Sequence, residues 1–130
     1  MGEDQILAYS HWEKDECYLS FYSLNTRSEL WRLPNMDTVL DFNPDSKEIW
    51  MLGQHINAQT QAYTDMVACH NFGDKKPLSF FHSTETKNFL KIYRNSTNPM
   101  ECVLTKDRTR LVVLWSYSHV LVGDLQASTS

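Results

Sequence analysis

The chain has 130 residues, of which 42% are hydrophobic and 12% aromatic, and its formal net charge is −4 at pH 7. This composition can bury a core, which excludes an intrinsically disordered chain, and the lack of a run of basic residues argues against nucleic acid as the main partner. No apolar stretch reaches the roughly 18 residues of a membrane span, so no membrane association is expected.

Short runs rich in β-branched and aromatic residues recur along the chain, separated by turn-forming residues. This pattern is typical of β-strands. Cys17, Leu19 and Phe21, for example, fall on one face of an extended segment. The sequence therefore predicts an all-β chain of antiparallel strands. We expect these strands at residues 5–12, 17–24, 29–33, 38–42, 48–52, 63–71, 77–82, 102–105, 110–115 and 119–125.

Two kinds of turn each occur twice between the expected strands. Residues 43–47, Asn-Pro-Asp-Ser-Lys, form a good type I turn, and residues 106–109 stand in the same place between two apolar runs. Residues 25–28 and 73–76 form the second kind of connector. The recurrence of both turns predicts a repeated structural unit.

The segments around these turns resemble parts of a WD repeat. Residues 39–53, in which an apolar strand ends in a Pro-Asp-Ser-Lys turn and a second strand follows, are similar to the opening of that repeat, and residues 103–113 are a weaker copy. Residues 19–30, 67–78 and 121–125 look like its third strand with the turn that follows. The resemblance implies a β-propeller built from antiparallel four-stranded blades.

Aligning these segments divides the chain into part of a blade at residues 1–34, a full blade at 37–83, a loop insertion at 84–100 and part of a third blade at 101–126. Propellers close with about four to eight blades. The resemblance therefore implies an open or partial ring, either cut from a longer protein or completed by another chain. Its unpaired sheet edges are expected to favour association.

The sequence departs from the family at the Trp-Asp pair that ends the third strand of each repeat. The equivalent positions read Tyr22-Ser23, His70-Asn71 and Gly123-Asp124. The hydrogen-bond network that rigidifies standard WD blades is therefore expected to be missing, and the blades would depend on strand alternation and turns alone.

The sequence lacks the residue spacings that carry catalysis or metal binding. It has no Cys-x-x-Cys or His-x-x-x-His pair, no Gly-x-Ser-x-Gly elbow and no glycine-rich phosphate loop. We therefore expect no enzyme activity, no metal and no cofactor. A propeller-type hydrolase is kept as an alternative, with His55, Asp65 and Asp41 as its candidate residues.

The loops between strands carry the stronger functional signal. In a propeller, residues 11–14, 54–61, 84–100 and 116–118 would emerge on one face. Aromatic and basic side chains dominate interface hot spots, so this face is predicted to bind a protein or peptide partner. The candidate partner-binding residues are Trp12, Lys14, Lys87, Phe89, Tyr93, Arg94 and Tyr117.

Two alternatives to this interpretation remain open. Residues 84–100 could instead pack Phe89, Leu90 and Ile92 against their own blade. Residues 87–93 come closest to a helix but are too few for a stable one. The chain also has the size of an intracellular lipid-binding β-barrel, which would enclose a ligand-sized cavity.

The cysteines and the first residues bear on the cellular compartment. Cys17, Cys69 and Cys102 are an odd number, each in or beside an apolar run, and predict free thiols in a reducing compartment. The first residues lack the pattern of a signal peptide. We therefore expect an intracellular protein, cytoplasmic or nuclear, in which the acceptor motif at Asn95 is not glycosylated.

Overall fold

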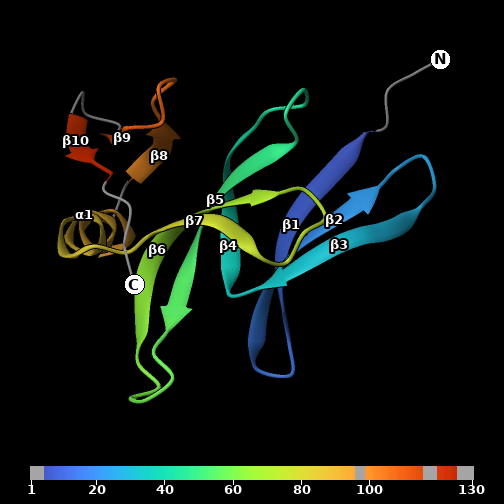
Figure 1. Cartoon of the computed structure of the whole chain (residues 1–130), viewed down its shortest axis with the longest axis horizontal. Helices are drawn as coiled ribbons and strands as arrows, with labels where there is room; N and C mark the ends of the chain where they lie inside the picture. The colour runs from blue at the N-terminus through green and yellow to red at the C-terminus, as the bar shows by residue number, and fades with distance from the viewer. Residues whose placement is uncertain (1–4, 96–98, 116–119, 126–130) are drawn as a thin grey trace.

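Ten strands and one helix form the part of the chain that the computed structural model describes, which covers residues 5–95, 99–115 and 120–125 (Figure 1). Each strand overlaps one that the sequence predicts, and the all-β class is confirmed. The strands are β1 (Ile6–Glu13), β2 (Glu16–Ser23), β3 (Ser28–Pro34), β4 (Met36–Phe42), β5 (Glu48–Ile56), β6 (Tyr63–Asn71), β7 (Pro77–Phe81), β8 (Pro99–Leu104), β9 (Arg110–Trp115) and β10 (Val120–Asp124).

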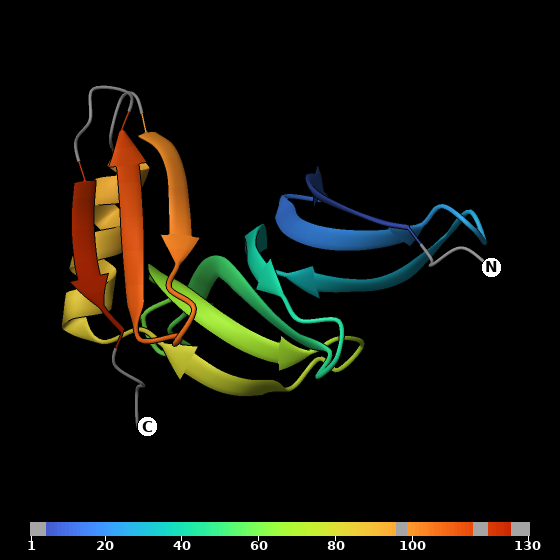
Figure 2. The ribbon, with the colours of Figure 1, turned by 90° about the horizontal axis from the view of Figure 1, so that it is seen from above.

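The described strands form three antiparallel sheets that follow one another along the chain (Figure 2). The first sheet has the order β1-β2-β3, the middle sheet β4-β5-β6-β7 and the third sheet β10-β9-β8. The strands are grouped as in the repeat alignment, in sets of three, four and three. The described sheets close no ring, and they do not merge into the single continuous sheet of a lipid-binding barrel.

Local turn chemistry explains why the strands reverse where they do. Asn43 Oδ1 accepts hydrogen bonds from the backbone N–H groups of Asp45 and Ser46, at 2.9 and 3.3 Å. Asp107 does the same at the β8–β9 turn, where its Oδ1 accepts from the N–H and hydroxyl of Thr109. These bonds hold the pKa of Asp107 down to about 2. Both predicted turns of this kind are therefore present.

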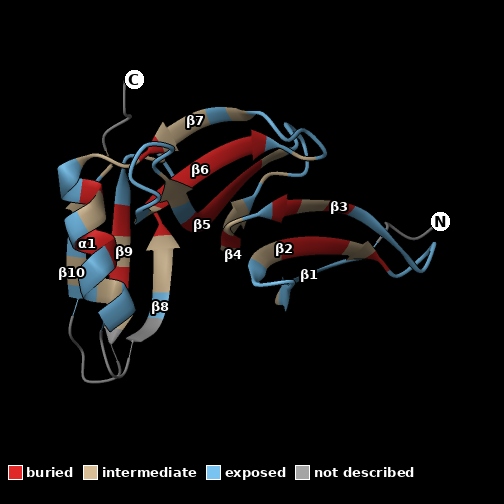
Figure 3. Cartoon of the chain, turned by 90° about the horizontal axis from the view of Figure 1, so that it is seen from below, coloured by how far each residue is buried: buried red, intermediate tan, exposed pale blue. Residues whose placement is uncertain are grey.

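The middle sheet is apolar on both faces. Ile49 and Met51 of β5 pack towards the first sheet, whereas Trp50 and Leu52, the alternate residues of the same strand, pack towards the third. Figure 3 shows the resulting bands of buried residues along β2, β3, β5, β6 and β9. A sheet with two apolar faces needs a neighbour on each side, and the first and third sheets supply them.

Residues 84–95 are helical, so the loop expected there is wrong over this range. Helix α1 (Thr84–Asn95) begins after Ser83, whose Oγ accepts a hydrogen bond from the backbone N–H of Thr86 at 3.3 Å, as an N-cap residue does. Phe89 and Leu90 are buried in the core between the middle and third sheets. Of the described residues, none forms a helix with the length and apolar character that crossing a membrane requires.

Candidate partner-binding site

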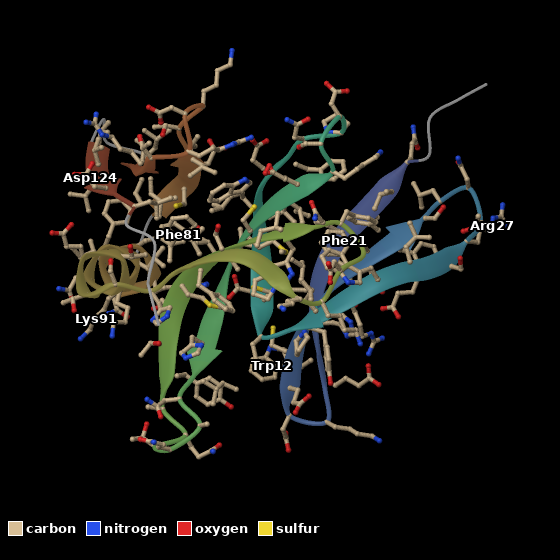
Figure 4. All side chains as sticks on the ribbon, viewed as in Figure 1. Trp12, Phe21, Arg27, Phe81, Lys91 and Asp124 are labelled. Atoms are coloured by element: carbon tan, nitrogen blue, oxygen red, sulfur yellow. The ribbon has the colours of Figure 1, made fainter. Side chains whose placement is uncertain are left out.

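The residues expected to bind a partner are divided between two parts of the molecule. Trp12 and Lys14 lie at the end of the β1–β2 hairpin, where Trp12 is 74% exposed. Lys87 is half-buried on helix α1, and Tyr117 lies outside the described residues. Figure 4 shows Trp12 beside the hairpin and well apart from Lys91 on the helix. Within the described residues, the candidate partner-binding residues therefore do not gather in a single loop cluster.

Three of the helix residues are engaged within the fold. Phe89 is only 8% exposed, and Tyr93 packs against the same core, where burial raises the pKa of its hydroxyl. Arg94 Nη2 lies 2.9 Å from Asp37 Oδ2, and its Nε lies 3.4 Å from Asp65 Oδ1. These contacts fasten the end of the helix to β4 and β6. The alternative in which residues 84–100 pack Phe89, Leu90 and Ile92 against the fold is correct for Phe89 and Leu90, which are buried. Ile92 is exposed.

A cleft of about 360 Å³ lies between the β1–β2 hairpin and the β5–β6 hairpin. The turns of both hairpins lie at the lower edge of the view in Figure 1. We call this feature the hairpin cleft, and residues of both the first sheet and the middle sheet line it. Its lining residues are Trp12, Asp15, Glu16, Cys17, Asn35, Gln54, Ile56 and Tyr63.

The first wall of the hairpin cleft follows from a tight two-residue turn. Lys14 and Asp15 have φ angles of 52° and 66°, the left-handed conformation that both central residues of a type I′ hairpin turn require. The turn sets Trp12 directly opposite Cys17, so that both side chains lie on the same face of the hairpin. Trp12 thereby stands at the mouth of the cleft, with Cys17 deeper inside.

The second wall is a row of residues on one face of the β5–β6 hairpin. Ile56 pairs with Tyr63 and Gln54 pairs with Asp65, and the two pairs are two residues apart along the strands. Tyr63 is 60% exposed, which gives the cleft a second large accessible aromatic ring. The loop expected at residues 54–61 did not include Tyr63, because Tyr63 begins the strand expected at residues 63–71.

The floor of the hairpin cleft is held by backbone hydrogen bonds from Asn35. Its N–H donates to the carbonyl of Cys17 at 2.7 Å, and its own carbonyl accepts from the N–H of Gln54 at 2.8 Å. Asn35 adopts a φ of 64°, which asparagine tolerates better than most residues. A Cβ at Gly53 would lie 2.3 Å from the Asn35 carbonyl, so only glycine permits this approach. The two walls are therefore rigidly spaced.

The carboxylates at the mouth of the hairpin cleft differ in their partners. Glu13 is ion-paired with Arg32 Nη1 at 2.9 Å. Asp15 and Glu16, which line the cleft, have no ion pair among the described residues. The Tyr18 hydroxyl donates a hydrogen bond to Glu16 Oε2 at 2.6 Å. The Glu16 carboxylate therefore lies on the face of the hairpin that carries Tyr18 and Arg32, opposite to the face of Trp12 and Cys17.

The thiol of Cys17 is held in its neutral form. Burial raises its pKa, and the nearby carboxylate of Asp37 adds to the effect, while Arg94 opposes it. The Sγ–H group donates weakly to the Met36 carbonyl at 3.7 Å. A protonated thiol is a poor nucleophile, so Cys17 contributes shape and apolar surface to the cleft.

The residues considered for hydrolysis are not brought together. His55 is directly opposite Thr64 between β5 and β6, so its side chain and that of the adjacent Asp65 point to opposite faces of the sheet. Asp41 lies near the other end of β4 and is ion-paired with Arg108 of the β8–β9 turn. Within the described residues, no group of His, Cys, Asp and Glu side chains could hold a metal ion.

A second cavity, of about 170 Å³, opens between the first and middle sheets at the opposite end of β1. Ile6, Ala8, Phe21, Phe42 and Phe72 are among its lining residues, and all of these are apolar. It continues the core between the two sheets and lacks charged groups to orient a ligand. The hairpin cleft combines exposed aromatic residues with polar residues, and is the better candidate.

Comparison of the chain with models of protein families, with curated proteins and with solved structures gives no match. The functional argument therefore depends on the geometry of the hairpin cleft.

Proposed function

We propose that this chain is a non-catalytic scaffold that binds a protein or peptide partner in the hairpin cleft. The observation that carries the proposal is the pair of aromatic side chains, Trp12 from the first sheet and Tyr63 from the middle sheet, which are 74% and 60% exposed and line the same cleft. Large rings exposed together mark interaction sites, because covering them releases much apolar surface from water.

The fixed floor of the cleft supports the same proposal. Asn35 bonds to Cys17 on one wall and to Gln54 on the other, so the two aromatic rings are already held apart at a defined spacing. A preorganised site loses less conformational entropy when the partner binds, and this raises affinity. Asn35 is thus a positioning residue for the binding surface.

We further propose that the three sheets are successive WD-like blades of a larger propeller, completed by more blades in this chain or in another. The division of the described strands into sets of three, four and three supports this, as do the two apolar faces of the middle sheet. Cys17, Cys69 and Cys102 are free, which supports a reducing, intracellular location. In such a ring the hairpin cleft would lie between adjacent blades.

The test is selection of ligands from a displayed library of random linear peptides on the purified chain. Enriched peptides are then measured by fluorescence anisotropy against Trp12→Ala and Tyr63→Ala. We expect each variant to weaken binding about tenfold or more, as truncation of a hot-spot residue does. Because both side chains are exposed, the melting temperature is expected to stay the same.

Leu24→Ala is the matched control, since Leu24 is an apolar residue with 48% exposure just after β2 and does not line the hairpin cleft. This variant is expected to bind the selected peptides as the unaltered chain does. Failure to select any peptide whose binding depends on Trp12 and Tyr63 would overturn the proposed function.

A further inference from the structure

Strand β1 differs from the other end strands of the described sheets. Bulges, prolines and charges normally keep an end strand from pairing with another chain. The pairing of β3, β4, β7 and β8 is interrupted by register shifts, and β10 has only five residues. β1 pairs with β2 over eight residues in one unbroken register, and residues 6–12 include no acidic residue, lysine, arginine or proline. The edge of β1 is therefore open to pairing.

The register of the β1–β2 hairpin determines which backbone groups of β1 face this edge. The N–H of Leu24 donates to the carbonyl of Gln5 at 2.9 Å, so residue 5 and every second residue after it bond to β2. The N–H and carbonyl groups of the residues between them point away from β2, and no described strand lies beside them. These outward-facing residues are Ile6, Ala8, Ser10 and Trp12.

The side chains of the same residues lie on one face of β1, and they differ from one end of the strand to the other. Ile6 and Ala8 line the apolar cavity of about 170 Å³ between the first and middle sheets. Trp12 lies on the same face at the far end of the strand and is 74% exposed. Within one chain it stands about 20 Å from Ile6, too far to cover the cavity.

A second copy of the chain brings a matching strand to this edge. Two identical antiparallel strands are related by a two-fold axis perpendicular to the sheet, so each face keeps the same set of side chains from both copies. The register centred on Tyr9 pairs the whole of residues 6–12 and joins the outward-facing backbone groups of both strands. It sets Ile6 opposite Trp12 of the second copy, and Glu13 then lies opposite an uncharged residue.

We propose that two copies of this chain form a symmetric dimer in which their β1 strands pair about Tyr9 and Trp12 of each copy fills the apolar cavity of the other. The cavity continues the core between the first and middle sheets, because Phe21 and Ile49 belong to both. Trp12 of the second copy therefore extends an existing apolar interface and loses its own contact with water. The dimer forms where no further blade occupies the edge of β1, and it competes with a peptide in the hairpin cleft for Trp12.

Cysteine cross-linking of the full chain tests the register. In the proposed dimer the two copies of residue 9 are directly opposite, with Cα atoms about 4.5 Å apart, which a disulfide can bridge. We expect Tyr9→Cys to form a disulfide-linked dimer under mild oxidation. Leu7→Cys is the matched control, since its two copies lie about 14 Å apart along the strands. It is expected to match the unaltered chain, whose free cysteines set the background, and to cross-link only when mixed with His11→Cys.

Sedimentation equilibrium then tests the position of Trp12. We expect Trp12→Ala and Ile6→Ala each to weaken dimerisation about tenfold, and the double variant to weaken it by less than the product, because the two side chains meet only between copies. Tyr63→Ala is the control, since Tyr63 lines neither β1 nor the apolar cavity, and it is expected to weaken peptide binding and leave the dimer unchanged. The melting temperature of each variant verifies its folding.

The possible failures are distinguishable. A monomeric mass at all concentrations, or cross-linking of Leu7→Cys by itself in place of Tyr9→Cys, would overturn the dimer. Independent effects of Ile6→Ala and Trp12→Ala would overturn the insertion of Trp12 into the cavity. The absence of any peptide that depends on Trp12 and Tyr63 would overturn the proposed function and leave the dimer standing.

Discussion

Two buried polar atoms face the interface between the first and middle sheets without a hydrogen-bond partner. His70 Nδ1 lies 3.0 Å from the Asp74 carbonyl, which can only accept, so Nδ1 carries the proton and Nε2 is left as an acceptor. Trp31 Nε1, a donor, is also unpaired, and the two rings are 6.0 Å apart. The His70 ring is therefore buried with one unpaired acceptor, beside a Trp31 ring with one unpaired donor.

The burial of His70 makes the stability of the fold depend on pH. Burial lowers the pKa of the imidazole, although the hydrogen bond to the Asp74 carbonyl opposes the shift. Between the folded and unfolded pKa values the unfolded chain binds more protons, so the free energy of unfolding falls as pH falls. We expect denaturant unfolding to show this loss between about pH 7 and pH 5, and His70→Phe to flatten it. His82, whose pKa burial also lowers, accounts for the slope that remains.

Trp31→Phe is the control for this prediction. It removes the unpaired N–H and keeps His70 buried beside an aromatic ring, so the pH slope is expected to persist. An unchanged slope in His70→Phe would contradict the assignment of the effect to His70.

At the scale of the elements, helix α1 packs closely against strand β10 because residue 123 is a glycine and has no side chain. A Cβ at Gly123 would lie 2.3 Å from Cδ2 of Phe89, and other ring atoms of Phe89 are almost as close. Phe89 of the helix therefore occupies the space that a side chain at residue 123 would need.

This fit predicts a coupled effect of two substitutions. Gly123→Ala is expected to lower the free energy of unfolding by about 1–3 kcal/mol, because the buried ring must shift. Phe89→Ala is expected to lower it by about 3–5 kcal/mol. Together they are expected to cost less than their sum, because the alanine at 123 then meets open space. Chemical denaturation of the three variants measures the coupling, and simple additivity would contradict it.

At the scale of the whole molecule, the outermost strands leave sheet edges unpaired among the described residues. β1 is an end strand of the first sheet and is exposed along nearly its whole length (Figure 3). β10 is an end strand of the third sheet, where Val120 and Val122 are 55% and 53% exposed. Long apolar edges of this kind pair with other chains.

We therefore expect the purified chain to associate reversibly through β1, with an average mass that rises with concentration in light scattering. Leu7→Lys is expected to reduce this association, because a charge on an edge strand opposes pairing. Leu24→Lys is the control, since Leu24 is similarly exposed at 48% but lies in the turn after β2 and not on an end strand. A mass that stays monomeric at all concentrations, or falls equally in both variants, would contradict the prediction.

The sequence by itself determined the strands and turns. Strand composition and turns such as 43–47 depend on neighbouring residues, so local patterns located every described strand and the chain reversals between them. Trp12 and Lys14 were also identified as exposed, because a tight hairpin must present its tip to solvent. Helix α1 was not predicted, although residues 87–93 came closest to a helix, because a helix this short depends on burying Phe89 and Leu90 between sheets.

Only the tertiary structure decided which of the candidate residues share a site. Arg94 was expected to meet a partner and instead pairs with Asp37 and Asp65, which are distant in the sequence. Tyr63 was expected only as the first residue of a strand, and it lines the hairpin cleft together with Trp12. The physical reason is the same in each case: strand alternation places a side chain on one of two faces, but what covers that face depends on contacts between sheets.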